Sequence, residues 1–338
     1  MKKALTALVL ALVLLALCEP HVRESIARSI SGLGREENET QIESQKLSFS
    51  EHLGSAEKSD ILDVTLYYRF GKTELLGAQR VQLDLKREET IATRIVQRIV
   101  DGPDISHDRL SGVFPQGTQV ISVTGEGRTA FVTLSEAFLG RPDGAPTDWE
   151  DLPVWQEEAA RRRRLAVQSL VLALTEDGRY QRVQLYVADN DDDLPRRVAM
   201  AWFDPSVTDP TLVLAASPRD EKIMLTPHRA MTMILEAWQK RDYESLYLLL
   251  APEKGETMLA PSEFAAEMNE IDVSLLEYET TQGTISYDGQ IATMVFDAEI
   301  RSAVGGDAQI VRESVPLVRW RDNWAIEMST LRSLMIRD

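Results

Sequence analysis

Cysteine and histidine are scarce in this sequence, and this limits the chemistry open to it. The chain has 338 residues with one cysteine, Cys18, and four histidines: His21, His52, His107 and His228. A single thiol excludes a disulfide within the chain and a cysteine-rich zinc site. So few imidazoles do not favour a multi-histidine site either. We therefore expect no metal and no cofactor.

Basic residues are also scarce relative to acidic ones. Lysine and arginine together number 37 against 54 aspartate and glutamate residues, which gives a formal net charge of −17. Such a surface repels a phosphate backbone, so we expect no nucleic-acid partner. Hydrophobic residues make up 43% of the chain and charged residues 27%, which is typical of globular proteins with apolar cores. The length favours two domains over one.

Long apolar runs are limited to one segment near the N-terminus. Residues 4–18 are apolar apart from Thr6, and they follow Lys2 and Lys3. This pattern matches the charged and hydrophobic regions of a secretory signal. As a helix the run would span about 22 Å, which is short of the ~30 Å hydrocarbon core of a bilayer. It predicts export, with the remaining chain at the outer face of the cytoplasmic membrane.

The manner of attachment stays open between three alternatives. The residues before Cys18, Leu15-Ala16-Leu17, resemble a bacterial lipobox, although Leu17 stands where a small residue is expected. Residues 1–18 are thus a lipoprotein signal with lipid on Cys18, an uncleaved anchor, or an ordinary cleaved signal. Residues 19–60 are polar and poor in aromatics. That composition predicts a flexible spacer.

Residues 61–190 are expected to form the first domain. β-branched and aromatic residues, with partial alternation, predict strands at 61–70, 81–85, 119–124, 129–134 and 183–187. Helical spacing of apolar residues predicts one helix from Ile91 to just before Gly102-Pro103, and a second at 156–175. The order ββαββαβ predicts an α+β domain with one five-stranded sheet and two helices, on one face of it.

Short motifs in this domain resemble the GerMN domain of sporulation and spore-germination proteins. They occur in the opening strand, after the first helix, and in the loop before the hairpin, at Tyr67, Gly102, Pro103, Pro115, Gly117 and Thr118. The resemblance covers residues 61–190 and implies structural roles for these six. It also implies an envelope protein of sporulation, germination or wall-associated assembly, often a lipoprotein.

A linker and a second domain are expected to follow. Residues 191–221 are rich in aspartate and proline and predict a linker, and residues 222–338 the second domain. Thr226-Pro227 is typical of a helix start. After further short helices, strands are predicted at 274–282, 291–300, 310–319 and 324–329. Helices followed by an antiparallel meander resemble the nuclear-transport-factor-two-like (cystatin-like) α+β roll.

A run of arginines on the second helix is the sharpest charge feature. Successive helical residues lie ~100° apart, so the run spreads around the helix. The simplest interpretation is a solvated face that pairs with Glu157 and Glu158. The alternative is contact with an anionic wall polymer or an acidic partner surface. The run consists of Arg161, Arg162, Arg163 and Arg164.

Catalytic candidates are few. In the roll, Tyr243, Tyr247, Asp297 and Glu299 offer acid and base groups, but tyrosines at such spacing are more often core residues. The sequence therefore favours a non-enzymatic, membrane-tethered binding or assembly protein of the bacterial envelope, with envelope proteins or peptidoglycan as partners. The alternative is a small-molecule or glycan-binding protein that uses the roll cavity. A cell-wall hydrolase is the third hypothesis.

Overall fold

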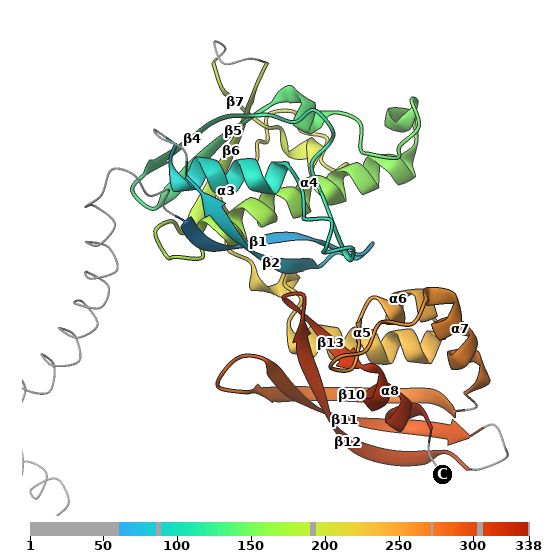
Figure 1. The fold of residues 1–338 in the computed structure, drawn as a ribbon. Helices are drawn as coiled ribbons and strands as arrows, with labels where there is room; N and C mark the ends of the chain where they lie inside the picture. Colours follow the sequence, from blue (N-terminus) through green and yellow to red (C-terminus); the bar gives the residue numbers. More distant parts are fainter. Residues whose placement is uncertain (1–60, 86–88, 190–193, 272, 303–306, 337–338) are drawn as a thin grey trace, which may run out of the picture. The chain divides into compact units, whose positions relative to one another are not determined.

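The computed structural model describes residues 61–85, 89–189, 194–271, 273–302 and 307–336 (Figure 1). The expected signal or anchor, the spacer and Cys18 lie outside these residues. Within the described ranges, helices and β-sheets form two α+β domains, as the sequence predicts, and two of the sheets contain one parallel pair of strands each. None of the helices in this part of the chain has the length and apolar character needed to cross a bilayer.

The first domain contains two sheets rather than one. The smaller sheet is antiparallel, and its strands are β1 (Ile61–Phe70), β2 (Leu76–Asp84) and β3 (Leu110–Ser111), in the order β2-β1-β3. The larger sheet has the order β4-β5-β6-β7, formed by β4 (Val120–Glu126), β5 (Thr129–Ser135), β6 (Arg182–Ala188) and β7 (Arg196–Arg197). The expected single five-stranded sheet is therefore wrong, because among the described residues β1 and β2 do not pair with any strand of the larger sheet.

The two long helices of this domain lie between the sheets (Figure 1). Helix α3 (Ile91–Val100) contacts β1 and β4, and α4 (Pro153–Leu174) contacts β1 and β6. The last ten residues of α4 are buried on nearly every side, apart from the partly exposed Gln168. A helix that is apolar around its whole circumference needs cover on more than one side. The expectation that both helices cover one face of one sheet is corrected accordingly.

Part of the expected linker is folded onto the first domain. Strand β7 pairs with β6 at one end, and β8 (Ser217–Pro218) pairs with β6 at the other. Between them, Val198 and Phe203 are buried in the core. Residues 196–218 are thus a covering segment of the larger sheet. Pairings of two residues leave no periodic signal in a sequence, which explains why this segment reads as a linker.

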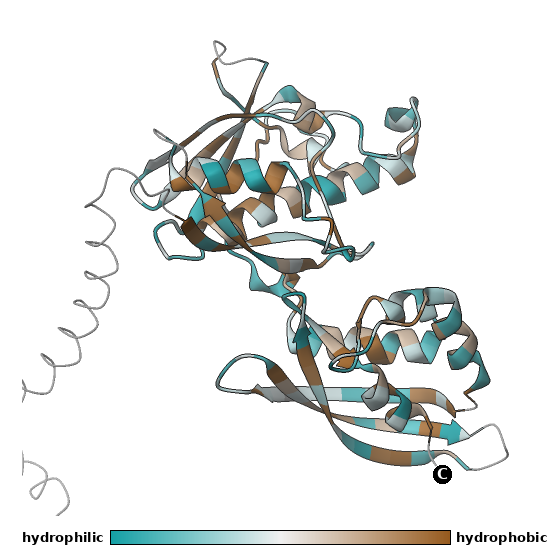
Figure 2. Ribbon diagram, in the orientation of Figure 1, coloured by the Kyte–Doolittle hydropathy of each residue, from teal (hydrophilic) through white to brown (hydrophobic). Residues whose placement is uncertain are grey.

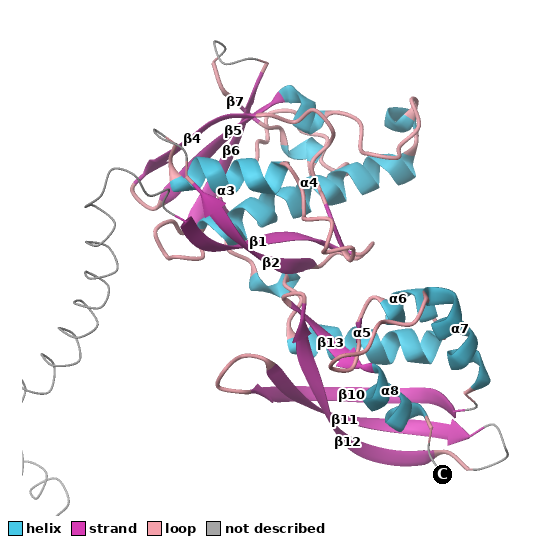
Figure 3. Ribbon diagram, viewed as in Figure 1, coloured by secondary structure: helices cyan, strands magenta, loops and turns pink. Residues whose placement is uncertain are grey.

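The second domain has the predicted order of helices followed by a meander (Figure 3). Its helices are α5 (Pro227–Lys240), α6 (Tyr243–Tyr247), α7 (Pro261–Glu270) and the unpredicted α8 (Met328–Met335). Its five-stranded sheet has the order β10-β11-β12-β13-β9. The strands are β9 (Leu250–Ala251), β10 (Val273–Ile285), β11 (Ile291–Ser302), β12 (Gln309–Trp320) and β13 (Asn323–Glu327). The Thr226 hydroxyl accepts a hydrogen bond from the Arg229 amide at 3.3 Å and caps α5 as expected.

Alternation along β11 defines the core of this domain. Its even-numbered residues from Ala292 to Ile300 are buried, and the odd-numbered residues between them are only partly covered. Figure 2 shows both brown and teal bands along the strands of this sheet. Since successive side chains of a strand point to opposite faces, one face of the sheet packs on the helices and the other faces away from them.

The turn between β12 and β13 contacts β2. Both turn residues, Arg321 and Asp322, have positive φ values of 46° and 63°, as tight hairpins require. The next residue, Asn323, accepts a hydrogen bond from the Ala78 amide at 2.8 Å and donates one to the Ala78 carbonyl at 2.9 Å. The Asp322 carboxylate also accepts from the Arg80 amide at 2.9 Å. The hairpin is therefore fixed to the edge of β2 by backbone and side-chain hydrogen bonds.

Candidate functional site

Five of the six motif residues gather around one groove on the first domain. The groove has a volume of about 910 Å³, and Gly102, Pro103, Pro115, Gly117 and Thr118 line it. A second wall is formed by the loop of residues 140–144. These segments are far apart in the sequence, so the fold makes the groove by bringing together the end of α3, the loop before β4 and the loop after β5. We call this feature the motif groove.

A tight turn forms one wall of the motif groove. The Thr118 amide donates to the Pro115 carbonyl at 3.2 Å, and the Thr118 hydroxyl donates to the same oxygen at 2.7 Å. Gly117 has a φ of +85° at the third position of this turn, where a type II turn needs a positive φ. A Cβ built on Gly117 would meet no atom within 4 Å. The glycine is therefore required by backbone conformation and not by lack of space.

The end of helix α3 forms an adjoining wall. Gly102, with a φ of +91°, follows the last helical turn, and its amide donates to the Ile99 carbonyl at 3.2 Å. A glycine in this conformation followed by proline is a common helix stop. The Arg98 guanidinium donates to the Gly102 carbonyl and to the Asp104 carboxylate. These contacts fix the position of the backbone where it leaves α3 and begins to line the motif groove.

Tyr67 lies away from the groove, in the core between β1 and α4. Its hydroxyl donates to the Glu176 carboxylate at 3.0 Å, and its carbonyl accepts a hydrogen bond from the Ser169 hydroxyl. Burial, together with the nearby Glu176 charge, raises the pKa of Tyr67 to about 12. Through these hydrogen bonds Tyr67 connects β1 to α4 and to the residue Glu176 that follows it.

Arg163 departs from the expected solvated arginine face. Its side chain is buried, and its guanidinium donates to the carbonyls of Leu139, Gly140 and Trp202 at 2.7, 3.2 and 3.3 Å. The guanidinium carbon lies 4.8 Å from the centre of the Trp202 ring and 5.6 Å from that of Trp149. Burial lowers the pKa of Arg163 to about 10. Arg163 is thus a structural residue, held by backbone carbonyls and indole rings.

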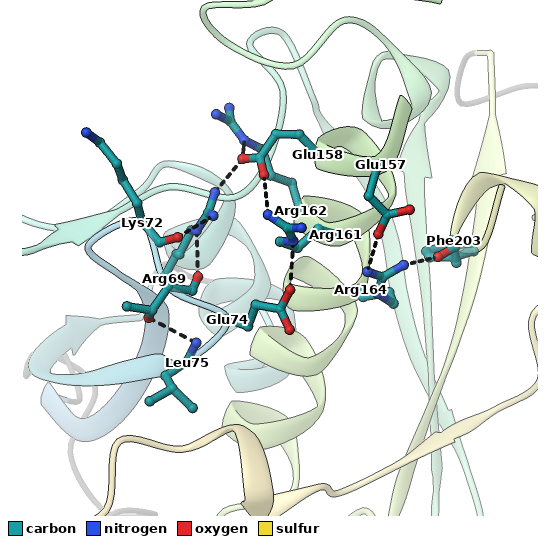
Figure 4. Close-up of polar contacts among 11 residues, drawn as sticks. Arg69, Lys72, Glu74, Leu75, Glu157, Glu158, Arg161, Arg162, Arg164 and Phe203 are labelled. Atoms are coloured by element: carbon teal, nitrogen blue, oxygen red, sulfur yellow. Dashed lines mark hydrogen bonds and ion pairs between the residues drawn. The ribbon is translucent and has the colours of Figure 1, made fainter. Parts of the chain in front are cut away.

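The other three arginines form ion pairs along α4 (Figure 4). Arg162 lies 2.8 Å and Arg161 3.2 Å from Glu158, and Arg164 lies 3.2 Å from Glu157. These are the two acidic partners that the sequence indicates. Most of the positive charge in the run is therefore paired within the domain. Little unpaired positive charge therefore remains on the run to attract an anionic polymer.

Arg69 completes this network, and its role was not predicted from the sequence. Its guanidinium lies 2.6 Å from Glu158 and donates to the carbonyls of Lys72 and Thr73, each at 2.8 Å (Figure 4). Burial alone would raise the pKa of Glu158, but hydrogen bonds from Arg69 and Arg162 hold it below its usual value. The sequence feature that could have indicated this role is the position of a charged residue within the apolar run of β1.

The family comparison concerns the first domain. The model of the Germane family, described as sporulation and spore germination, matches residues 65–193. Residues 65–193 form a Germane domain. This domain links the chain to the proteins of sporulation and germination. No curated protein matches the sequence.

Several solved structures match parts of the chain at low sequence identity. The first GerMN domain of the sporulation protein GerM from Bacillus subtilis is 18% identical, with 48% of this chain and 98% of that one covered and a TM-score of 0.28. The tandem GerMN domains of the same protein are 13% identical, cover 73% and 64%, and have a TM-score of 0.31. A ketosteroid isomerase-like protein from Erwinia carotovora atroseptica SCRI1043 is 14% identical, covers 29% and 85%, and has a TM-score of 0.22.

The four acid–base candidates of the roll do not converge on a pocket. The hydroxyls of Tyr243 and Tyr247 donate to the carbonyls of Met268 and Leu259 at 3.1 and 2.7 Å, and both rings pack on Phe264. Asp297 and Glu299 alternate with buried residues of β11, so they lie on the sheet face away from the helices. Among the described residues, no group of three or more His, Cys, Asp or Glu side chains is suited to hold a metal.

The second wall of the motif groove was not predicted from the sequence. Gly140, Arg141, Asp143 and Gly144 line the groove from the loop that follows β5. In the sequence this stretch is a loop without a motif, and nothing there indicates what it faces. The motif groove is therefore lined on one side by motif residues. On the other side it is lined by residues 140–144, which belong to no motif.

Proposed function

We propose that the chain is a non-catalytic, membrane-tethered protein of the bacterial envelope, which holds a segment of another envelope protein in the motif groove during sporulation or germination. The observation that supports this most is the gathering of five motif residues around one open groove of about 910 Å³. Binding sites usually lie in pockets where residues from several loops come together.

The composition of the motif groove favours an extended peptide over a reaction centre. Several glycines line it, namely Gly102, Gly112, Gly117, Gly140 and Gly144. Because glycine has no side chain, a partner backbone can come close to main-chain N–H and C=O groups, as in recognition by strand addition. The charged side chains of the groove belong to Asp101, Arg141 and Asp143, and all three are exposed. Exposed charges at a rim select partners and steer their approach.

The location forms part of the same proposal and is supported by Lys2, Lys3 and the apolar run at 4–18. Mass spectrometry of the mature N-terminus separates the three modes of attachment. An acylated Cys18 supports the lipoprotein, an intact Met1 the uncleaved anchor, and a start beyond Cys18 an ordinary cleaved signal. Recovery of the chain only from the cytoplasmic fraction would contradict export.

Charge reversal in the groove tests the binding function. We expect Arg141→Glu in the full chain to reduce co-purification of envelope proteins from crosslinked, detergent-solubilised envelopes. Arg128 is also an exposed arginine of the domain but lies outside the motif groove, in the turn before β5. Arg128→Glu is therefore the matched control and should retain the partners. Equal retention by both variants, or cleavage of purified peptidoglycan by the chain, would overturn the proposal.

A further inference from the structure

A second cavity of the first domain is walled by tryptophan. It has a volume of about 390 Å³, and Trp149, Glu150, Gln156, Arg163 and Trp202 are among its lining residues. It shares no lining residue with the motif groove. The indoles come from η3 (Trp149–Asp151) and η4 (Met200–Trp202), two short 3₁₀ helices that flank α4. We call this cavity the tryptophan pocket.

The indole walls are held in place before any ligand arrives. The Arg163 guanidinium contacts both rings, with its carbon 5.6 Å from the centre of Trp149 and 4.8 Å from the centre of Trp202. The guanidinium itself is held by the carbonyls of Leu139, Gly140 and Trp202. A wall that is already ordered does not have to lose conformational entropy on binding, which favours a ligand of modest size.

The charges of the tryptophan pocket cancel. Arg163 and Glu150 are its only charged lining residues, and the two attract each other. Because the two opposite charges offset each other, the pocket has no net charge that would select a cation or an anion. The lining therefore favours a neutral ligand with an apolar face for the indoles and hydrogen-bonding groups for the Gln156 amide and the Glu150 carboxylate.

We propose that the tryptophan pocket binds an uncharged sugar ring of an envelope glycan. The C–H face of a sugar ring is apolar and packs on an indole, while the hydroxyl and acetamido groups at its edge donate to a carboxylate and exchange hydrogen bonds with an amide. The volume falls within the ~300–1,000 Å³ of small-ligand sites. The glycan is assigned to the envelope because of the location proposed for the chain. The binding of a sugar ring does not depend on that location.

The test is a titration of the full chain in detergent with an oligomer of N-acetylglucosamine, followed by saturation-transfer NMR and tryptophan fluorescence. We expect saturation of the ring protons, and about tenfold weaker binding by Trp202→Leu because one stacking wall is lost. Trp155→Leu is the matched control, since Trp155 packs beside this region without lining the pocket. Its affinity should stay that of the wild type. Glu150→Gln should weaken binding without changing the far-ultraviolet circular dichroism.

Three results would overturn the proposal. They are the absence of saturation transfer, equal binding by Trp202→Leu and the wild type, and tighter binding of an anionic uronate oligomer than of the neutral one. None of these depends on Arg141 or on export. Failure here therefore leaves the envelope-protein proposal untouched, and failure of that proposal leaves sugar binding to be judged by its own titration.

Discussion

At the scale of single residues, four consecutive arginines have different roles. Arg163 follows Ala159 by four residues and precedes Ala166 by three and Leu170 by seven, so it lies on the buried face of α4. The sequence did carry this signal, but the run of equal charges concealed it. Its neighbours lie on faces where Glu157 and Glu158 are within reach. Position on the helix, not charge, decides which arginine is structural.

We predict that Arg163→Met lowers the free energy of unfolding by about 3 kcal/mol or more, because it leaves buried carbonyls without their charged donor. Arg161 is partly exposed in its ion pairs, so Arg161→Met should cost less than about 1 kcal/mol. Urea denaturation of the two variants under one set of conditions measures the difference. Equal losses would contradict the assignment of Arg163 to the core.

Tyr67 gives a prediction on pH. Its pKa is raised from 10.0 to about 12, so the folded state holds the neutral phenol more strongly than the unfolded state does. The resulting stability is complete below pH 10.0 and is lost as the pH rises toward about 12. We expect the wild type to lose about 2 kcal/mol more than Tyr67→Phe over that range. A constant difference between the two proteins would refute this role of the hydroxyl.

At the scale of elements, the sequence predicted most strands and helices but not how the strands divide into sheets. Alternation identifies a strand, yet it does not say which strand pairs with which. The decisive feature is α4, whose residues 165–174 are apolar in nearly every direction and so need two covering layers. Segment 196–218 was missed because its contacts with β6 depend on two short pairings and a few buried side chains.

The turn that bounds the motif groove gives a prediction at this scale. Gly117→Ala should cost about 1–2 kcal/mol, because φ is positive there. Gly112 lines the same groove without a positive φ, so Gly112→Ala is the control and should be nearly neutral. Thermal unfolding of both variants measures the contrast. If the two substitutions have the same effect, the backbone conformation of the turn is not what requires glycine.

At the scale of the whole described chain, the β12–β13 hairpin joins the roll to β2. Asn323 is buried, and its side-chain amide forms hydrogen bonds with both the N–H and the C=O of Ala78. A Cβ on Gly77 would lie 2.6 Å from the Asn323 oxygen, so this approach also needs a glycine in β2. Residue patterns within each domain do not reveal such a contact, because its partners are distant in sequence.

We predict that Asn323→Ala speeds hydrogen exchange of the Ala78 amide at least tenfold, because that amide loses its hydrogen-bond acceptor. A tenfold change in the exchange rate corresponds to a free-energy difference of about 1.4 kcal/mol. Asn269→Ala is the control, because Asn269 is exposed and its amide contacts only the carbonyl of Ala265 in its own helix. Unchanged exchange at Ala78 in the Asn323 variant would show that the hairpin does not hold β2 in solution.

The central claim is that the motif groove holds a partner from the envelope. A photocrosslinking amino acid at Gln116, which is exposed on the groove wall, tests it in the organism that carries this chain. The same amino acid at Arg128 reports random encounters on the same domain. We predict a discrete adduct with an envelope protein from position 116 that position 128 does not give. Identical adduct patterns at the two positions, or none at position 116, would contradict the account.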